Sequence, residues 1–388
     1  MREMIEARPR HRALIAAALA ALVALIGLAA VPAAEAKKKP KGVQVKVMTR
    51  NLFLGADLSP GLNATSFQEF TAANGDILEE VDQTNFPLRA QGLAAEIASK
   101  KPDLVGLQEV AWWRTNATPG APQQGPTGAF TATDTRYDFL ALLQEQLAAR
   151  GVNYTVAVEK VEFDFEAPAD TDNNPNTGLA GGDIQGRLTM RDVILVNDDS
   201  KVKAKVKNPQ SGTYASLYTP SISGIPVPVT RGWTAVDAAV KKGKGKKKVT
   251  KKFRFVNTHF EAFDDETQRP SIRAQQATEV VNGPASAKRT IMLGDFNSDS
   301  PGVQPGDEQA FDVILAAGFE RRTNAPGSCC VPNLFTGPAT AFDHQVDHIV
   351  TNMGKKAKLV NTSVVGTAPV NGIYPSDHAG VFSTLKLK

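Results

Sequence analysis

Five places in this 388-residue chain put a polar side chain directly after or before an apolar, strand-like run. They are Asn51, Glu109, His259, Asp295 with Asn297, and Asp377 with His378. Carboxylate and amide oxygens are the ligands that Mg²⁺, Mn²⁺ and Ca²⁺ prefer. The sequence has no C-x-x-C pair, and His344 with His348 has no third ligand nearby, so we expect one of these hard cations rather than zinc.

The segment IMLGDFNSD at residues 291–299 leaves its local geometry open. If the strand continues, its alternation places Asp295 and Asn297 on the same face. If a turn follows Gly294, the two side chains are released from that alternation. Both residues could also be plain turn formers, and Glu109 a plain surface glutamate. The recurrence of such residues at several strand ends favours a functional site.

The elements that must position these residues follow from apolar periodicity and from Gly and Pro breaks. Strands are predicted at 43–51, 101–110, 154–165, 191–197, 200–208, 227–240, 251–260, 289–296, 346–352 and 379–388. Helices are predicted at 66–84, 88–100, 136–151, 271–282 and 306–319, a surface insertion at 114–135 and a polar loop at 166–183. Because many strands follow one another as hairpins, the pattern favours an α/β (α+β) fold with an antiparallel-rich, two-layered sheet core flanked by helices.

The N-terminal 36 residues have the layout of a signal peptide. Four arginines precede a long apolar run that ends in Ala34-Glu35-Ala36, and we expect cleavage after Ala36. An uncleaved membrane anchor is the alternative, because the run is long enough to approach a bilayer span. Residues 37–42 then form a short basic linker and 43–388 the folded domain, which works outside the cytosol. After cleavage we expect no membrane span.

Two lysine clusters carry much of the net charge of +4. The first is in the linker, and the second, KKGKGKKKVTKK at 241–252, has the composition of a hairpin tip between two strands. Such a tip is a solvated surface or a contact for nucleic acid or another anionic surface. The adjacent cysteines Cys329 and Cys330 are expected to be reduced or bonded to each other, without a role in metal binding or nucleophilic attack.

Seven short motifs occur in an order that resembles the endonuclease/exonuclease/phosphatase superfamily, which includes DNase I-like nucleases, apurinic-site endonucleases, sphingomyelinases and inositol-phosphate phosphatases. They are MTRN (48–51), LVGLQEV (104–110), RDVILV (191–196), NTHFEA (257–262), GDFNSD (294–299), VDHIV (346–350) and SDH (376–378). The resemblance covers roughly residues 43–386 and implies a catalytic domain of a secreted, bacterial-type member. The implied fold is a four-layered α/β sandwich with two mixed, largely antiparallel sheets packed face to face and helices outside.

The resemblance also implies a metal site and a residue that acts on water. Glu109 would be the principal metal ligand, Asn51 would support the metal or the phosphate, and Asp377 would lie beside the metal. Asp295 would orient or deprotonate the attacking water. Asn297 would hold the phosphate or the carboxylate of Asp295.

The remaining implied roles concern the phosphate. His378 resembles the histidine that stabilises or protonates the transition-state phosphoryl oxygen, and Asp347 the acid that pairs with it. His259 resembles a second phosphate-facing histidine. Arg191 resembles an arginine that some members aim at the phosphate. We expect His348, which neighbours Asp347 on a strand, to point the other way and to be structural.

A phosphodiester is anionic and repels hydroxide, so its hydrolysis needs a cation, a positioned water and donors for the charge that develops at phosphorus. We therefore expect a secreted, monomeric, Mg²⁺- or Mn²⁺-dependent phosphodiesterase that is a nuclease, with Ca²⁺ as another candidate ion. The alternative substrates are a sphingomyelin-type phospholipid, an inositol phosphate or another small phosphate ester. A non-catalytic secreted binding protein on the same fold is the alternative from another class.

Overall fold

The computed structural model describes residues 42–200, 205–242, 248–263, 269–303 and 308–388. The predicted signal peptide and all of the predicted linker except Gly42 lie outside these residues, so both stay predictions. None of the described helices is both long and apolar enough to cross a membrane.

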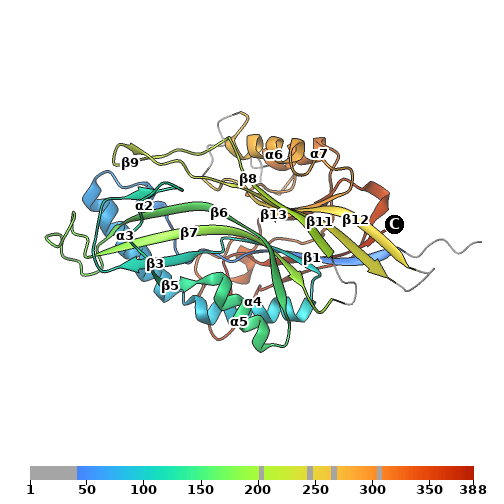
Figure 1. Cartoon of the computed structure of the whole chain (residues 1–388), viewed down its shortest axis with the longest axis horizontal. Helices are drawn as coiled ribbons and strands as arrows, with labels where there is room; N and C mark the ends of the chain where they lie inside the picture. Colours follow the sequence, from blue (N-terminus) through green and yellow to red (C-terminus); the bar gives the residue numbers. More distant parts are fainter. Residues whose placement is uncertain (1–41, 201–204, 243–247, 264–268, 304–307) are drawn as a thin grey trace, which may run out of the picture. The chain divides into compact units, whose positions relative to one another are not determined.

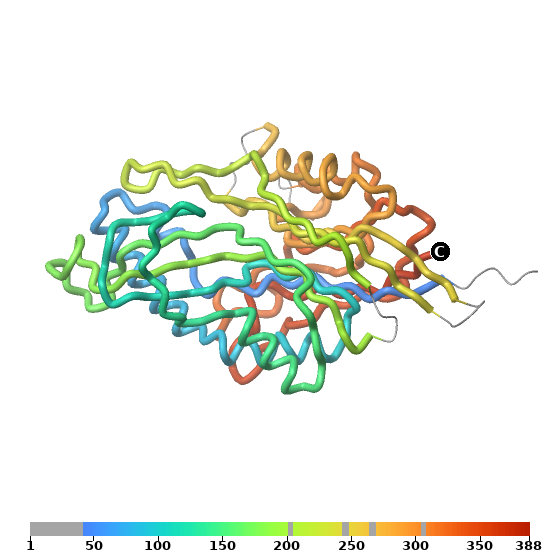
Figure 2. Tube along the Cα trace, in the orientation of Figure 1, coloured from blue at the N-terminus to red at the C-terminus, as the bar shows by residue number. Residues whose placement is uncertain are grey.

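The first sheet has nine strands. Its main path runs β16-β17-β1-β2-β7-β3-β5, and β6 pairs with β7 and β4. The strands are β1 (Val43–Asn51), β2 (Leu104–Gln108), β3 (Trp112–Asn116), β4 (Gln123–Gln124), β5 (Asp134–Asp138), β6 (Tyr154–Ala169), β7 (Ile184–Asn197), β16 (Ala357–Val365) and β17 (Gly380–Leu387). Because β1 pairs with β17, the first and last strands lie side by side (Figure 2).

The second sheet has six strands in the order β14-β15-β13-β12-β11-β8. They are β8 (Lys205–Thr213), β11 (Gly232–Lys242), β12 (Val249–His259), β13 (Thr290–Asp295), β14 (Glu320–Arg321) and β15 (Asp347–Thr351). A separate short hairpin joins β9 (Ser221–Ile222) and β10 (Ile225–Pro226). In the described residues β1 pairs with β2, and β12 with β13, in parallel, and the other strand pairs are antiparallel.

The two sheets pack face to face through alternate apolar residues. Val43, Val45 and Val47 of β1 belong to one buried cluster with Phe255 of β12 and Leu293 of β13. In β1 the polar Gln44 and Lys46 between these valines are exposed, as the period of two requires. The inner faces of both sheets thus form one core.

Helices cover the outer faces (Figure 1). The helices α3 (Phe67–Gln83), α4 (Phe86–Lys100) and α5 (Phe139–Ala149) pack on the first sheet, and α6 (Ile272–Asn282) and α7 (Gln309–Ala316) on the second. A short helix, α2 (Ser59–Leu62), precedes α3, and two 3₁₀ turns span Ala339–Ala341 and Gly354–Lys356. This order of helix, sheet, sheet and helix confirms the predicted four-layered α/β sandwich.

Two predicted non-strand segments are partly wrong. The surface insertion at 114–135 contains most of β3, all of β4 and the start of β5, and the polar loop at 166–183 contains the end of β6. Backbone pairing holds these segments: β3 pairs with β5 and β7, β4 pairs with β6, and the β6–β7 ladder runs from Tyr154↔Asn197 to Ala169↔Ile184. The edge strand β16 was also not predicted, because most of its side chains are exposed or only half-buried and do not form a buried apolar run.

Candidate active site

All of the predicted site residues except Arg191 meet at one edge of the paired sheets. The parallel strands β1 and β2 end there at Asn51 and Gln108, and the parallel strands β12 and β13 end there at His259 and Asp295. The antiparallel β15 begins at the same edge, since Asp347 pairs with Asp295. The directions of these strands therefore bring together side chains that are far apart in the sequence, such as those of Asn51 and Asp295.

Asn51 joins two carboxylates of the site, those of Glu109 and Asp295. Its Nδ2 donates to Oε1 of Glu109 at 3.0 Å and to Oδ2 of Asp295 at 2.9 Å. Its Oδ1 accepts from the backbone N–H of Phe53 at 2.9 Å. Glu109 has a left-handed backbone (φ 53°), and its Oε2 accepts from the N–H of Leu54 at 2.8 Å. The amide therefore fixes the position of Glu109 on one sheet relative to Asp295 on the other.

Asp295 is followed by a turn, which settles the geometry of the IMLGDFNSD segment. The strand ends at Asp295, Asn297 has φ 45°, and the N–H of Asn297 donates to Oδ1 of Asp295 at 2.9 Å. Gly294 adopts φ 152°, and a Cβ there would clash with the carbonyl oxygen of Thr258. Burial raises the pKa of Asp295 to about 7, and the neighbouring Asp347 adds to the rise while His378 opposes it.

His378 is held by a buried carboxylate. Its Nδ1 lies 2.8 Å from Oδ2 of Asp347, and its Nε2 lies 3.6 Å from Oδ2 of Asp295. Burial lowers the pKa of His378, but the carboxylates of Asp347, Asp295 and Asp377 outweigh burial, and the pKa lies well above its usual value. The imidazole is therefore a cation that directs an N–H toward the cluster.

His259 is the second histidine beside Asp295. Its Nε2 is 3.6 Å from Oδ2 of Asp295 and 3.1 Å from Nδ2 of Asn297, and its Nδ1 is 3.2 Å from the guanidinium of Arg231. Burial, with Arg231 and His378, holds the pKa of His259 well below its usual range. The two histidines thus differ in charge, because His259 is neutral where His378 is protonated.

Glu109 and Asp377 are two carboxylates of the site that could hold a hard cation together. Burial raises the pKa of Asp377, His378 opposes this rise, and the charge of Glu109 adds to it, so the two acids are crowded. A cation bound between carboxylates offsets such repulsion. Oxygen ligands of this kind suit Mg²⁺ or Mn²⁺. The residues present therefore fit the predicted metal, with Glu109 and Asp377 holding it and Asn51 supporting Glu109.

The structure does not bring Arg191 into this cluster. Its guanidinium donates to the carbonyl oxygens of Val110 and Ala111 and to Asp138 at 2.6 Å, and it pairs with Glu159 at 3.3 Å. These contacts hold the segment after Glu109 against β7. The other predicted site residues lie together at the one edge of the sheets. They are Asn51, Glu109, His259, Asp295, Asn297, Asp347, Asp377 and His378. His348 points away from it, as predicted, and its Nε2 meets the carbonyl of Ser298 at 2.9 Å.

Arg231 is a site residue that the sequence did not single out. It is buried, it contacts His259, and one of its terminal nitrogens lies 3.5 Å from Oε1 of Glu261. The next residue, Gly232, pairs with His259 across the β11–β12 ladder. The sequence could have indicated Arg231 through the predicted hairpin. If the two strands on either side of the lysine-rich tip are paired residue by residue, Arg231 falls next to the residue opposite His259.

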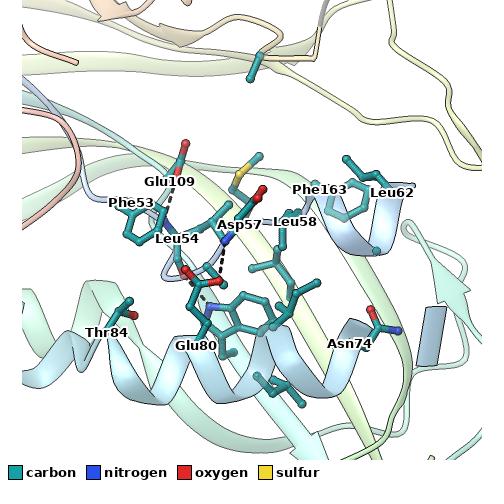
Figure 3. A pocket seen from close by; sticks show the side chains of 18 of the residues that line it. Phe53, Leu54, Asp57, Leu58, Leu62, Asn74, Glu80, Thr84, Glu109 and Phe163 are labelled. Carbon is teal, nitrogen blue, oxygen red and sulfur yellow. Dashed lines mark hydrogen bonds between the residues drawn. The ribbon is translucent and has the colours of Figure 1, made fainter. Parts of the chain in front are cut away.

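A chamber of about 580 Å³ opens from the cluster. Glu109, Asp377 and Arg231 line it together with apolar residues such as Leu58, Leu62 and Phe163. Figure 3 shows Glu109 on one side of the chamber and Leu62 and Phe163 on the other. Cys329 and Cys330 form a disulfide with each other, and Sγ of Cys330 lies both in the chamber wall and 3.8 Å from Nε2 of His378. The chamber thus connects the charged cluster to an apolar space.

Comparison with solved structures shows similar chains. An endonuclease/exonuclease/phosphatase family protein from Bacteroides thetaiotaomicron is 15% identical with a TM-score of 0.50, covering 90% of this chain and 99% of that chain. One from Leptotrichia buccalis is 14% identical with a TM-score of 0.49, covering 88% and 100%. A mannosyl-6-phosphatase of Bacteroides thetaiotaomicron is 16% identical with a TM-score of 0.47, covering 88% and 99%. At 15% sequence identity, the similarity to the first of these structures shows that this chain shares its fold, and it shows nothing about activity.

The sequence matches none of the curated proteins with which it was compared. Residues 73–378, by contrast, match the endonuclease/exonuclease/phosphatase family. This span contains Glu109, Asp295 and His378 and is most of the chain, so the chain belongs to the endonuclease/exonuclease/phosphatase family.

Proposed function

We propose that this chain is a divalent-metal-dependent phosphodiesterase in which water attacks the phosphorus. The observation that carries the proposal is the position of Oδ2 of Asp295. It lies 2.9 Å from the amide of Asn51 and 3.6 Å from the Nε2 atoms of both His259 and His378. This carboxylate therefore lies beside Asn51, which supports the metal ligand Glu109, and beside two imidazoles. In that position it can act on a water next to a bound phosphate.

Each residue of the cluster would contribute one part of the reaction. Asp295, whose pKa is raised to about 7, accepts the proton of the attacking water near neutral pH. His378, protonated through its contact with Asp347, donates to a phosphoryl oxygen as charge develops there. Arg231, which contacts neutral His259, adds a further donor group beside the cluster. These are the groups that the reaction of an anionic ester requires.

A divalent cation held by Glu109 and Asp377 would neutralise charge on the phosphate. The family is divalent-metal dependent, and Asp295, Asp347 and His378 of the described chain lie within reach of one another at this edge. Mg²⁺ or Mn²⁺ suits these oxygen ligands, and Ca²⁺ suits them less because it takes more ligands. We propose Mg²⁺ or Mn²⁺ as the working ion.

Residues 243–247 of the lysine cluster lie outside the described residues, and the position of its described lysines does not favour the predicted nuclease. On β12, Lys251 and Lys252 lie at the end remote from His259. Lys251 is eight residue steps along the strand from that histidine, a distance of roughly 26 Å. Lys241 and Lys242 pair with this remote end. These lysines are therefore too far away to hold the phosphates that adjoin the scissile one, and DNA cleavage becomes an outcome of the test below.

We further propose that the protein acts outside the cytosol as a monomer. The layout of the first 36 residues supports export. All residues of the cluster come from one chain, so a single copy carries the complete site.

The test is hydrolysis of bis-p-nitrophenyl phosphate and of plasmid DNA by the purified mature chain with Mg²⁺, Mn²⁺ or EDTA. We expect turnover of the ester with either metal and none with EDTA. Asp295→Asn should lower kcat by about a hundredfold or more, since it removes the base. Asp312→Asn, on the exposed face of α7, is the matched control and should keep the wild-type rate. Absence of turnover with both metals, or a wild-type rate in Asp295→Asn, would contradict the proposal.

A further inference from the structure

We propose that the substrate is a phosphate ester with a long apolar group, and that this group occupies the chamber while the phosphate lies at the cluster. The inference rests on the proposed phosphodiesterase function and adds the substrate class to it. The chamber measures about 580 Å³, within the range of sites that enclose a whole small molecule. A bound phosphate group alone would fill only a small part of this volume.

The chamber and the cluster share residues, so a single molecule can reach both. Glu109, Asp377 and Arg231 line the chamber. Arg231 also contacts His259 at 3.2 Å, and Asp377 precedes His378. Figure 3 shows Glu109 at one end of the labelled side chains and Leu62 and Phe163 at the other. An ester bound at the metal carboxylates thus points its substituent along this wall.

The wall beyond the cluster is predominantly apolar and comes from separate elements. Leu62 lies on α2, Ile77 on α3, Phe163 on β6, Leu188 on β7 and Ile222 on the β9–β10 hairpin, and Phe335 belongs to the loop before β15. An alkyl or acyl chain would exchange water for these side chains, which is favourable in proportion to the apolar area removed from water.

The charges on the chamber wall oppose a polyanion. Among the described residues that line the chamber, Arg231 is the single cation, whereas Asp57, Glu80, Glu109 and Asp377 are acids. One arginine and one metal match one phosphate. A nucleic acid carries a phosphate at every nucleotide and needs a basic path along its backbone. The chamber therefore fits one phosphate with an apolar substituent.

The chamber also exposes apolar groups at its mouth. Phe335 lines the chamber and is 50% exposed, and Leu58, Leu62 and Phe163 are half-buried. Side chains that only filled a core would be closed off from water, as Phe139 and Leu143 on α5 are. A partly open, concave apolar wall beside polar groups is the form of a ligand site.

The experiment is a series of alkyl p-nitrophenyl phosphates, from methyl through butyl and hexyl to octyl, assayed with the metal-loaded mature chain. Each methylene that enters the chamber should raise kcat/KM by about fourfold at full burial. We expect a total gain of at least about a hundredfold between the methyl and octyl esters, allowing for incomplete burial. The esters are kept below the concentration at which they aggregate, so a gain reports on single molecules rather than on lipid surfaces.

Two wall variants test the location. Phe163→Asp places a charge in the wall, and Phe335→Ser removes an exposed ring at the mouth, where folding is least affected. Both should lower the ratio of octyl to methyl kcat/KM by about tenfold or more. Val360→Asp, on the edge strand β16 and 50% exposed, is the control and should keep the wild-type ratio.

The outcomes separate this inference from the function on which it rests. Turnover of the methyl ester with no gain from longer chains would overturn the apolar substrate and leave the phosphodiesterase intact. A wild-type ratio in both wall variants would overturn the chamber as its location. A failure to hydrolyse any ester with either metal would overturn the phosphodiesterase itself, and faster cleavage of DNA than of the octyl ester would assign the site to nucleic acid.

Discussion

Replacement of Glu162 by glutamine should remove a large part of the pH dependence of folding stability. Glu162 lies on β6 where the β6–β7 register shifts, and it is 2% exposed. Within the described residues neither of its carboxylate oxygens has a hydrogen-bond partner, and the same is true of Asp192 on β7. Burial raises the pKa of Glu162 to about 8, although Lys160 and Arg231 oppose the rise.

The sign and size follow from proton linkage. The carboxyl of an unfolded glutamate has a pKa of about 4.3. Between that value and the folded pKa of about 8, the folded chain keeps a proton that the unfolded chain releases. Stability from this group is therefore complete below pH of about 4 and is lost as the pH rises to about 8, at about 1.4 kcal/mol per pH unit. From pH 5 to 8 the loss is about 4 kcal/mol.

Urea unfolding of the mature chain, followed by circular dichroism from pH 5 to 8, would measure this slope. Glu162→Gln should flatten the curve by about 1.4 kcal/mol per pH unit relative to wild type, since glutamine does not titrate. Glu145→Gln, an exposed change on α5, is the control and should leave the slope as it is. Parallel curves for wild type and Glu162→Gln would refute the claim that this buried carboxyl is protonated in the folded state.

Three further changes probe the active site. Arg231→Gln removes the cation that contacts His259, and kcat/KM for a phosphodiester should fall by about tenfold or more; an unchanged value would show that the arginine does not serve the phosphate. Asp347→Asn removes the nearest carboxylate that raises the pKa of His378. The basic limb of the kcat–pH profile should therefore move to lower pH, and a limb that does not move would contradict the role of His378 as a donor. Asn51→Ala removes the two hydrogen bonds that position Glu109 and Asp295. Half-maximal activity should then need a higher Mn²⁺ concentration, and an unchanged Mn²⁺ dependence would contradict this positioning role.

The strand ends of the site were predictable from the sequence because local signals define them. Apolar runs that stop at Asn51, His259 and Asp295 mark the edge of buried strands, and the ladders bring these ends together. The face-to-face sheets and the outer helices likewise follow from periodicity that a core enforces. These predictions needed little knowledge of long-range contacts.

Features that depend on register or on several distant segments were not predicted. Arg231 has no local mark, and its role follows from the pairing of Gly232 with His259. Arg191 begins the strand predicted at 191–197, but in the structure it lies within β7, and its partners Asp138 and Glu159 come from other elements. The chamber wall likewise combines short contributions from helices, strands and a loop, none of which is distinctive alone.

The central claim, that Glu109 and Asp377 hold one hard cation beside Asp295, is tested most directly by titrating Mn²⁺ into the mature chain in a calorimeter. Wild type should bind one Mn²⁺ per chain, and Glu109→Ala should bind it at least about tenfold more weakly while the circular dichroism spectrum stays unchanged. Equal Mn²⁺ affinity in wild type and Glu109→Ala would contradict the account.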